Sequence, residues 1–307
     1  MSVIYGLKNV KDDSRHRAVA IGVFDGVHWG HKAIFERVVA EAEMASLVSL
    51  VLTFERHPSE LLAPNNAPFY ISTLDQRIDL IRASGVDSIV VAEFDPAFAN
   101  LNRQEFLDEI LIKRLKAQCV VVGANFRFGK NREGDIRYLT EKAPEIGLNV
   151  AVVPAVVIDN APVSSTRIRA LLQRGDVELA SKLLSRRFAL RGTVVLGQQI
   201  GRTLGFPTAN IKSEPRQLIP GRGVYAVETT VDKTVYPGVC NIGTRPTFGV
   251  NDVSVEVHIA GFQGDIYGRQ LDVVFCRRLR DEMKFSSRDS LVAQIREDLQ
   301  RASGSCR

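Results

Sequence analysis

An α/β domain with a doubly wound parallel sheet, followed by a mostly antiparallel β-barrel with a C-terminal helix, is the fold that this sequence predicts. The first half of the chain alternates Val/Ile/Leu-rich runs with segments of helical periodicity, as in sheets that are buried on both faces. The second half carries short β-prone runs separated by Gly and Pro, which is typical of barrels. The length of 307 residues suits two domains. We place their boundary near residue 186, giving domains 1–185 and 186–307.

The expected strands of the first half are Val-, Ile- and Leu-rich and nearly continuous in their apolar character. They cover 18–24, 47–54, 88–94, 119–123 and 149–158. The helices expected between and after them cover 31–45, 74–84, 103–115, 136–145 and 166–184. Sheets of this kind bind their ligands at the carboxyl ends of the strands, so the loops that follow these strands are where we expect a site.

The second half contains further strand candidates and one closing helix. The strands cover 188–196, 223–231, 234–241, 254–259 and 270–275. The helix covers about 287–302, and Ser286 followed by Asp289 resembles a capping box at its start.

Composition narrows the class of protein. Apolar residues make up 45% of the chain and charged residues 24%, as in ordinary globular proteins. The sequence has no apolar run long enough for a membrane helix and no apolar leader at its start. Its four cysteines are scattered and form no C-x-x-C pair. We therefore expect a cytoplasmic protein with reduced thiols, without disulfides, a zinc site or a membrane partner.

The positive charge is concentrated in the second half. Residues 1–185 carry 22 basic and 23 acidic side chains, whereas residues 186–307 carry 18 and 12, within a net charge of +5. Such an excess suits nucleic acid or an anionic small molecule. Because the sequence has no RNA-binding aromatic pattern, zinc finger or long basic run, we favour nucleotide phosphates and expect no nucleic-acid partner.

The first strand runs directly into a glycine-rich segment, G-V-F-D-G-V-H-W-G-H at residues 22–31. Glycines such as Gly22 and Gly30 let the backbone approach a ligand closely. The next segment is helical, and the start of a helix attracts anions. His28 and His31 bracket Gly30, and both can stabilise charge on a phosphoryl group. Two surface histidines on a loop are the alternative, which their clustering in one strand–helix turn disfavours. A zinc site is weaker still, because no third ligand is near in sequence.

A second helix start carries S-S-T-R-I-R at residues 164–169. Hydroxyl side chains before an apolar-periodic run are typical of a helix N-cap. Together with backbone N–H groups and two arginines they can hold phosphates; an ordinary cap with surface arginines is the alternative. The phosphate-binding candidates in this segment are Ser164, Ser165, Thr166, Arg167 and Arg169.

Two further segments follow expected strands: T-F-E-R-H-P at 53–58 and G-A-N-F-R-F-G at 123–129. Phe126 and Phe128 flank Arg127, and the two rings either contact an aromatic ligand or belong to the core. The motifs H-x-G-H and S-S-T-x-I-R resemble those of nucleotidylyltransferases, and all four segments together resemble bacterial FAD synthetases. The resemblance implies transfer of AMP from ATP to FMN, with catalysis by His28, His31 and Arg167. It also implies nucleotide binding by Gly22, Phe24 and Gly30, and flavin binding by Asn125, Phe126, Arg127 and Phe128.

The second half holds the loop G-Q-Q-I-G-R-T-L-G-F-P-T-A-N at residues 197–210. It is not a P-loop, because no G-x-x-x-x-G-K-[ST] occurs. Thr208 and Asn210 are two residues apart, so both can face one Mg²⁺ ion if the segment is extended. A glycine-rich turn without a function is the alternative.

This loop resembles the riboflavin kinase pattern G-R-x-L-G-x-P-T-A-N, and further matches follow in order at 223–226, 241–248, 255–258, 265–268 and 280–285. The resemblance implies that Glu256 is the general base for the ribityl hydroxyl and that Arg280 contacts the flavin or phosphates. It implies nucleotide binding by Gly201, Arg202, Gly205 and Pro207. Val23, Arg56 and Gly261 depart from the residues usual in the family.

The whole chain is thus identified as a member of the bifunctional riboflavin kinase and FMN adenylyltransferase family. This implies riboflavin, FMN and ATP as substrates and Mg²⁺ as cofactor. Two alternatives stay open: that only one half is active, and that the chain is a flavin- or nucleotide-binding regulator without turnover. A positioned general base is of no use to a pure binding protein, which favours the enzyme. The sequence leaves self-association open.

Overall fold

The computed structural model describes residues 1–197, 201, 204–245 and 252–306. Its contacts divide the chain into two compact units: Met1–Pro68 with Leu74–Ser164, and Phe69–Thr73 with Ser165–Arg307. The segment 165–185, which we placed in the first domain, thus belongs to the second unit by its contacts. The domain limits at 185 and 186 remain a prediction.

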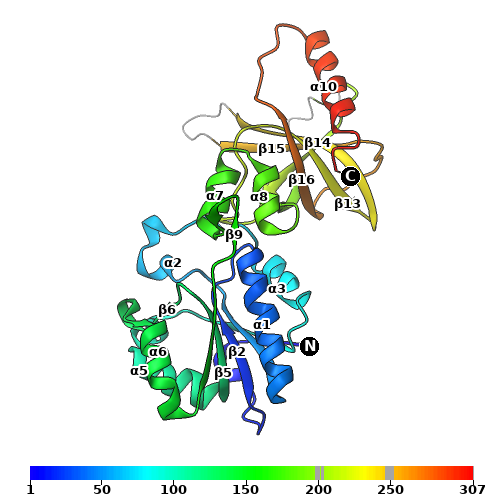
Figure 1. Cartoon of the computed structure of the whole chain (residues 1–307). Coiled ribbons are helices and arrows are strands. Elements are labelled where there is room, and N and C mark those ends of the chain that lie inside the picture. The colour runs from blue at the N-terminus through cyan, green and yellow to red at the C-terminus, as the bar shows by residue number, and fades with distance from the viewer. Residues whose placement is uncertain (198–200, 202–203, 246–251, 307) are drawn as a thin grey trace. The chain divides into compact units, whose positions relative to one another are not determined.

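The first unit is a parallel sheet with helices on both faces, as predicted (Figure 1). The strand order is β1-β4-β3-β2-β5-β8, and every neighbouring pair is parallel. These strands are β1 (Ser2–Tyr5), β2 (Arg17–Ile21), β3 (Val48–Phe54), β4 (Ser88–Ala92), β5 (Ala117–Gly123) and β8 (Asn149–Val153). The short hairpins are β6 (Arg127–Phe128) with β7 (Gly134–Asp135), and β9 (Val157–Ile158) with β10 (Ala161–Pro162).

The helices of the first unit are mostly where the periodicity placed them. They are η1 (Leu7–Asn9), α1 (Trp29–Ala45), α2 (Ser59–Leu62), η2 (Pro64–Asn66), α3 (Leu74–Arg82), α4 (Pro96–Asn100), α5 (Arg103–Glu105), the π-helix η3 (Phe106–Arg114), η4 (Lys130–Arg132), α6 (Ile136–Lys142) and η5 (Ala143–Ile146).

Two apolar cores lie on opposite faces of the sheet because side chains alternate along each strand. Ala18 and Ala20 of β2 face α1 and α3, whose Phe35, Val38 and Ile81 complete one core. Val19 and Ile21 of β2 point to the opposite face and pack with η3 and α6 in the other core. Because helices cover both faces of the sheet, its central strands carry apolar residues on both faces.

The second unit is a closed antiparallel barrel with the strand order β11-β12-β15-β14-β13-β16, as predicted. Its strands are β11 (Ala189–Val195), β12 (Thr208–Ser213), β13 (Gly223–Val231), β14 (Thr234–Arg245), β15 (Asp252–Ile259) and β16 (Gln270–Arg280). Its helices are α7 (Ser165–Gln173), α8 (Val177–Leu184) and the C-terminal α10 (Arg288–Ala302), which packs on β13, β14 and β16.

Several local features differ from the predictions. The stretch 166–184, expected as one helix, is divided into α7 and α8, and β12 was not expected as a strand. The edge strand β1 was not expected, because its four residues are too few for a clear pattern. The run at 149–158 breaks after Val153, and its end pairs in a separate hairpin. The capping box of α10 is made by Ser287 and Ser290, one residue later than expected. Among the described residues, none of the helices has the length and apolarity that a membrane span requires.

The expectation of four reduced thiols is also wrong. Cys276 of β16 and Cys306, just beyond α10, form a disulfide with their Cα atoms 5.2 Å apart. Cys276 and Cys306 are 30 positions apart in the sequence, so only the folded chain brings them close enough to form a disulfide. Cys119 and Cys240 are buried and free. Burial raises the pKa of the Cys119 thiol to about 11 and that of Cys240 further, so neither is a reactive thiolate near neutral pH.

Thiol titration tests this pairing. Without reductant, we expect no rapidly reacting thiol in the native protein, two in denaturant, and all four after reduction in denaturant. Cys306→Ser should destabilise the second unit by about 3 kcal/mol, because the bridge closes a loop of about 30 residues in the unfolded chain. Ser305→Ala is the control. Four denatured thiols without added reductant would contradict the disulfide.

Candidate functional site

The chain leaves β2 through a strained turn. Phe24 and Val27 have φ values of 53° and 41°, in the left-handed region that residues with side chains rarely adopt. Gly26, with φ of 83°, lies between them. Each such residue costs on the order of 1–3 kcal/mol, and the strain persists only where the surroundings impose it. The surrounding structure therefore holds this turn in a single conformation.

The turn ends at His28, which is the N-cap of α1. Its Nδ1 accepts the backbone N–H of His31 at 3.4 Å, and its carbonyl accepts the N–H groups of His31 and Lys32 at 2.8 and 3.0 Å. Because Nδ1 accepts, the proton of the neutral His28 ring is on Nε2. In that tautomer, Nε2–H is the hydrogen-bond donor of the ring.

The two histidine rings are held by packing. They stack with their centroids 3.6 Å apart and their planes at 19°. The Phe24 ring meets His31 edge-on at 5.2 Å and Phe35 at 4.8 Å. His28 is only 5% exposed. Fixed donors stabilise a developing charge without a reorganisation cost, so the structure brings the two predicted catalytic histidines together in a suitable form.

Gly30 makes room for the His28 ring. A Cβ atom there would lie 3.2 Å from Cε1 and 3.3 Å from Nδ1 of that ring, closer than side chains usually pack. Gly22 is constrained in the same way, because its Cβ would lie 2.9 Å from the Phe24 ring. Both glycines were predicted to contact a nucleotide, and the structure shows that they also set the positions of catalytic candidates.

A cavity of about 750 Å³ opens beside the turn. Residues at the ends of β2 and β3 line it, together with the segments that follow β4 and β5. The lining includes Gly22, Val23, Phe54, His57, Phe94, Phe98, Asn125, Phe126, Arg127 and Phe128. The four predicted flavin-binding residues thus share one cavity. Its volume and largely aromatic wall suit a flat ring system.

Phe126 and Phe128 pack in the core, as one interpretation expected, while contact with an aromatic ligand stays a prediction. Phe128 is 6% exposed and belongs to one core, and Phe126 packs on that core. The rings lie 5.5 Å apart with planes at 20°, and both line the cavity. Arg127 pairs with Asp135 at 2.5 Å. The Tyr138 backbone N–H and the Arg127 guanidinium hold the pKa of Asp135 below its usual value, so the pair stays charged.

The second phosphate motif begins α7. Ser165, Thr166 and Arg167 lie in its first turn, and Ser164 precedes it. The Nε of Arg169 donates to the Phe69 carbonyl at 2.7 Å, within the second unit. This bond holds the segment 69–73 to α7, so Arg169 has a structural role in addition to the predicted one.

In the barrel, strand register brings the predicted base and a predicted metal ligand side by side. Asn210 of β12 is the partner of Glu256 of β15, and Glu256 is the partner of Asn241 of β14. Directly paired residues point to the same face of a sheet, about 5 Å apart. Glu256 therefore lies between two amide side chains. Asn241 was not given a role from the sequence, because only the register makes it a neighbour of Glu256.

Thr208 and Asn210 lie on β12, so the condition that this segment be extended is met. Residues two apart on a strand share a face. Their hydroxyl and amide oxygens are of the kind that Mg²⁺ accepts. Gly197 and Gly201 approach the Asn210 side chain and the Phe206 backbone too closely for a Cβ. Arg202, also predicted here, lies outside the described residues.

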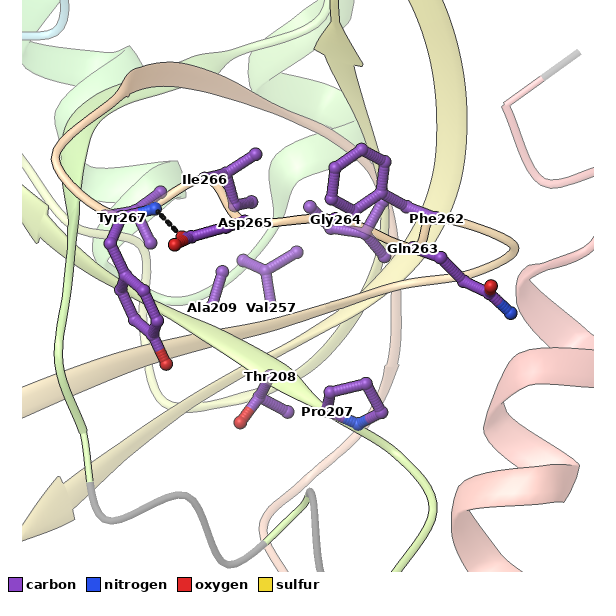
Figure 2. A pocket seen from close by; sticks show the side chains of 12 residues that line it. Pro207, Thr208, Ala209, Val257, Phe262, Gln263, Gly264, Asp265, Ile266 and Tyr267 are labelled. Atoms are coloured by element: carbon purple, nitrogen blue, oxygen red, sulfur yellow. Dashed lines mark hydrogen bonds between the residues drawn. The ribbon is translucent and has the colours of Figure 1, made fainter.

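A second cavity, of about 490 Å³, lies over the start of β12 (Figure 2). The loop 262–267 lies on one side and Pro207 and Thr208 on the other, with Ala209 and Val257 between them. Asp265 stabilises the loop by accepting the Tyr267 N–H at 2.9 Å. The predicted nucleotide residue Pro207 and the predicted metal ligand Thr208 therefore line one cavity.

Arg280 is held by an ion pair that the sequence did not predict. Its Nε and Nη2 donate to Asp298 of α10 at 2.8–3.1 Å, and Asp298 is 1% exposed. The guanidinium lies 5.9 Å from the Phe285 ring. A buried pair of this kind fixes the arginine in place. Asp298 has no local sequence signal, since only the packing of α10 brings it to β16.

The FAD synthetase family model matches residues 10–167, and the riboflavin kinase family model matches residues 184–306. The chain belongs to the bifunctional riboflavin kinase/FMN adenylyltransferase family. It is 38% identical over 300 residues to the bifunctional riboflavin kinase/FMN adenylyltransferase of Escherichia coli (strain K12), covering 97% of this chain and 96% of the relative. The enzyme of the same description from Haemophilus influenzae is 36% identical, covering 98% of each.

A solved structure covers both units. It matches with a TM-score of 0.90 and 32% identity over 98% of this chain and 99% of its own, and it is described as a macrolide-efflux protein from Streptococcus pneumoniae. That description differs from those of the two family models and the curated relatives. The structural likeness supports the fold of both units of this flavokinase/FAD synthetase family member.

Gly30→Ala tests the histidine pair. The change favours the helix by up to about 1 kcal/mol, but the new Cβ pushes on the His28 ring. We expect FAD formation from FMN to fall by about 10–100-fold, as small displacements of catalytic groups do, while FMN formation from riboflavin is unchanged. Both rates follow from chromatography of the flavins.

The exposed Glu36→Ala on the same helix is the matched control for this variant. Unchanged FAD formation in a folded Gly30→Ala protein would show that the position of His28 is not critical.

Proposed function

We propose that this protein makes FAD in two steps, with the barrel unit phosphorylating riboflavin to FMN and the first unit transferring AMP from ATP to FMN. The observation that carries the proposal is that each family model covers its own stretch of chain, and each stretch holds its own set of predicted catalytic residues. The stacked histidines belong to one set and Glu256, with its two amide neighbours, to the other. Intact sets in both halves disfavour a half-active enzyme or a pure binding protein.

In the kinase reaction, Glu256 would take the proton from the ribityl 5′-hydroxyl as that oxygen attacks the γ-phosphorus of ATP, whose bond to the β,γ-bridging oxygen breaks to release ADP. A carboxylate within hydrogen-bond reach of the hydroxyl suits this role. The amides of Asn210 and Asn241 flank Glu256 in register and limit the orientations of its carboxylate. Pro207 and Thr208 would bind the nucleotide in the cavity of Figure 2, and Arg280 would contact flavin or phosphate.

Mg²⁺, when bound, neutralises phosphate charge. Thr208 and Asn210 fit such an ion, since both offer neutral oxygens on one face of β12. ATP and Mg²⁺ suit a cytoplasmic enzyme. The Cys276–Cys306 bridge is unusual for that compartment, and mass spectrometry of alkylated protein from rapidly quenched cells would show its state there.

In the adenylyl transfer, a phosphate oxygen of FMN would attack the α-phosphorus of ATP and release pyrophosphate. His28 and His31 would donate hydrogen bonds to the charge that develops there. Ser164, Ser165, Thr166, Arg167 and Arg169 would bind the triphosphate, with Arg167 stabilising the leaving pyrophosphate. The isoalloxazine ring would lie in the aromatic cavity with Asn125, Phe126, Arg127 and Phe128.

A time course with riboflavin, ATP and Mg²⁺ tests the two-site proposal. We expect FMN to rise and then give way to FAD. His31→Ala should abolish FAD formation and leave FMN formation intact. Glu256→Gln, which keeps the shape of the side chain, should lower FMN formation by about 100-fold or more, as loss of a general base does, while added FMN is still converted to FAD. If either variant lost both activities while folded, two separate sites would be excluded.

Metal removal gives a further test. With the ion chelated, we expect both activities to stop and to return on addition of Mg²⁺, because phosphoryl charge is no longer neutralised. Thr208→Ala should raise the Mg²⁺ concentration needed for FMN formation and leave that for FAD formation unchanged. A Mg²⁺ dependence of FMN formation that is identical in Thr208→Ala and the wild type would argue against Thr208 as a ligand.

A further inference from the structure

Arg77, on α3, is a buried cation in the first unit, only 1% exposed. Its Nη1 donates to the Val23 carbonyl at 2.7 Å, and its Nη2 donates to the carbonyls of Phe54 at 2.6 Å and Glu55 at 3.3 Å. Burying a guanidinium is costly unless its donors are satisfied. The side chain therefore has a reason to be there beyond filling space, which an apolar residue does at lower cost.

The three acceptors lie where β2 and β3 end. Val23 is the second residue after β2, Phe54 is the last residue of β3, and Glu55 follows it. The Val23 carbonyl also accepts the Thr53 hydroxyl at 3.0 Å, so both of its lone pairs are used. Two donors on one carbonyl fix the direction in which the chain leaves β2.

The next residue is Phe24, the first of the three positive-φ residues in the turn that leads to His28. A strained turn keeps its conformation only if its ends are held. Arg77 and Thr53 hold the start, and the N-cap of α1 holds the end. Val23 and Phe54 also line the 750 Å³ cavity. The guanidinium thus connects the cavity wall to the turn that carries the histidines.

We propose that Arg77 is a positioning residue for adenylyl transfer: through the Val23 and Phe54 carbonyls it holds the strained turn so that His28 and His31 face the reacting phosphate. The positive charge and the donor atoms carry this role, not the volume of the side chain. The proposal rests on the proposed FAD-forming activity of the first unit.

Lysine and methionine separate these contributions, because their side chains are similar in length and only lysine has a charged donor. For Arg77→Met we expect kcat of FMN adenylylation to fall by about 100-fold, as for displaced catalytic groups. The KM for FMN should rise less than kcat falls. Arg77→Lys keeps a charge and one donor group but not the fork of two nitrogens, so it should retain clearly more activity than Arg77→Met and less than the wild type. Arg82→Met, an exposed arginine on the same helix that pairs with Asp79, is the matched control.

Riboflavin phosphorylation by the same chain is the internal reference and should stay within about twofold in every variant, because the barrel has its own site. Folding of the first unit is checked by near-UV circular dichroism. If folded Arg77→Met and Arg77→Lys adenylylate FMN equally well, the side chain only fills space and the proposal is wrong. A wild type that makes no FAD would instead overturn the proposed function.

Thr53→Val removes the second donor to Val23 with little change of shape, and it keeps the test valid if Arg77→Met does not fold. We expect its adenylylation kcat to fall several-fold, with FMN formation unchanged. Full activity of Thr53→Val would overturn the role assigned to the Val23 carbonyl.

Discussion

Backbone hydrogen bonding between strands in register is the interaction on which both candidate sites depend. In the first unit, parallel pairing of β2 with β3 and β5 aligns their carboxyl ends at one edge. In the barrel, antiparallel pairing places Glu256 between Asn210 and Asn241. A slip of one residue moves every side chain of a strand to the opposite face, so the chemistry of either site requires the register to be exact.

Besides strand register, each site depends on a second structural feature. After β2 this feature is backbone strain: the chain turns through positive φ values at Phe24 and Val27 and then enters α1, whose N-cap is His28. In the barrel it is ion pairing, since Asp298 holds Arg280 from a helix that packs on the outside. Burial of Asp298 is costly, and its hydrogen bonds to Arg280 offset that cost. Removal of either partner would leave the other without this bond.

Much of the fold and of the candidate sites could be predicted from the sequence. Nearly continuous apolar runs alternating with helical segments predicted the parallel sheet, and short β-prone runs separated by Gly and Pro predicted the barrel. The H-x-G-H and P-T-A-N segments predicted His28, His31, Thr208 and Asn210. Partners distant in the chain had no such signal. In the sequence, nothing distinguishes Arg77, Asn241 and Asp298 from ordinary polar residues. Nothing in it distinguishes a disulfide-bonded Cys276 from a free thiol.

The sequence by itself determined what is local: where apolar runs begin and end, which turns need glycine, and which motifs carry histidines, hydroxyls and a carboxylate. The tertiary structure decided which of these groups meet. Register made Asn241 a neighbour of Glu256, helix packing brought Asp298 to Arg280 and Cys306 to Cys276, and α3 brought Arg77 to the carbonyls below the histidine turn. The physical reason is that motifs are set by neighbours along the chain, whereas contacts between distant residues are set by how strands pair and helices pack.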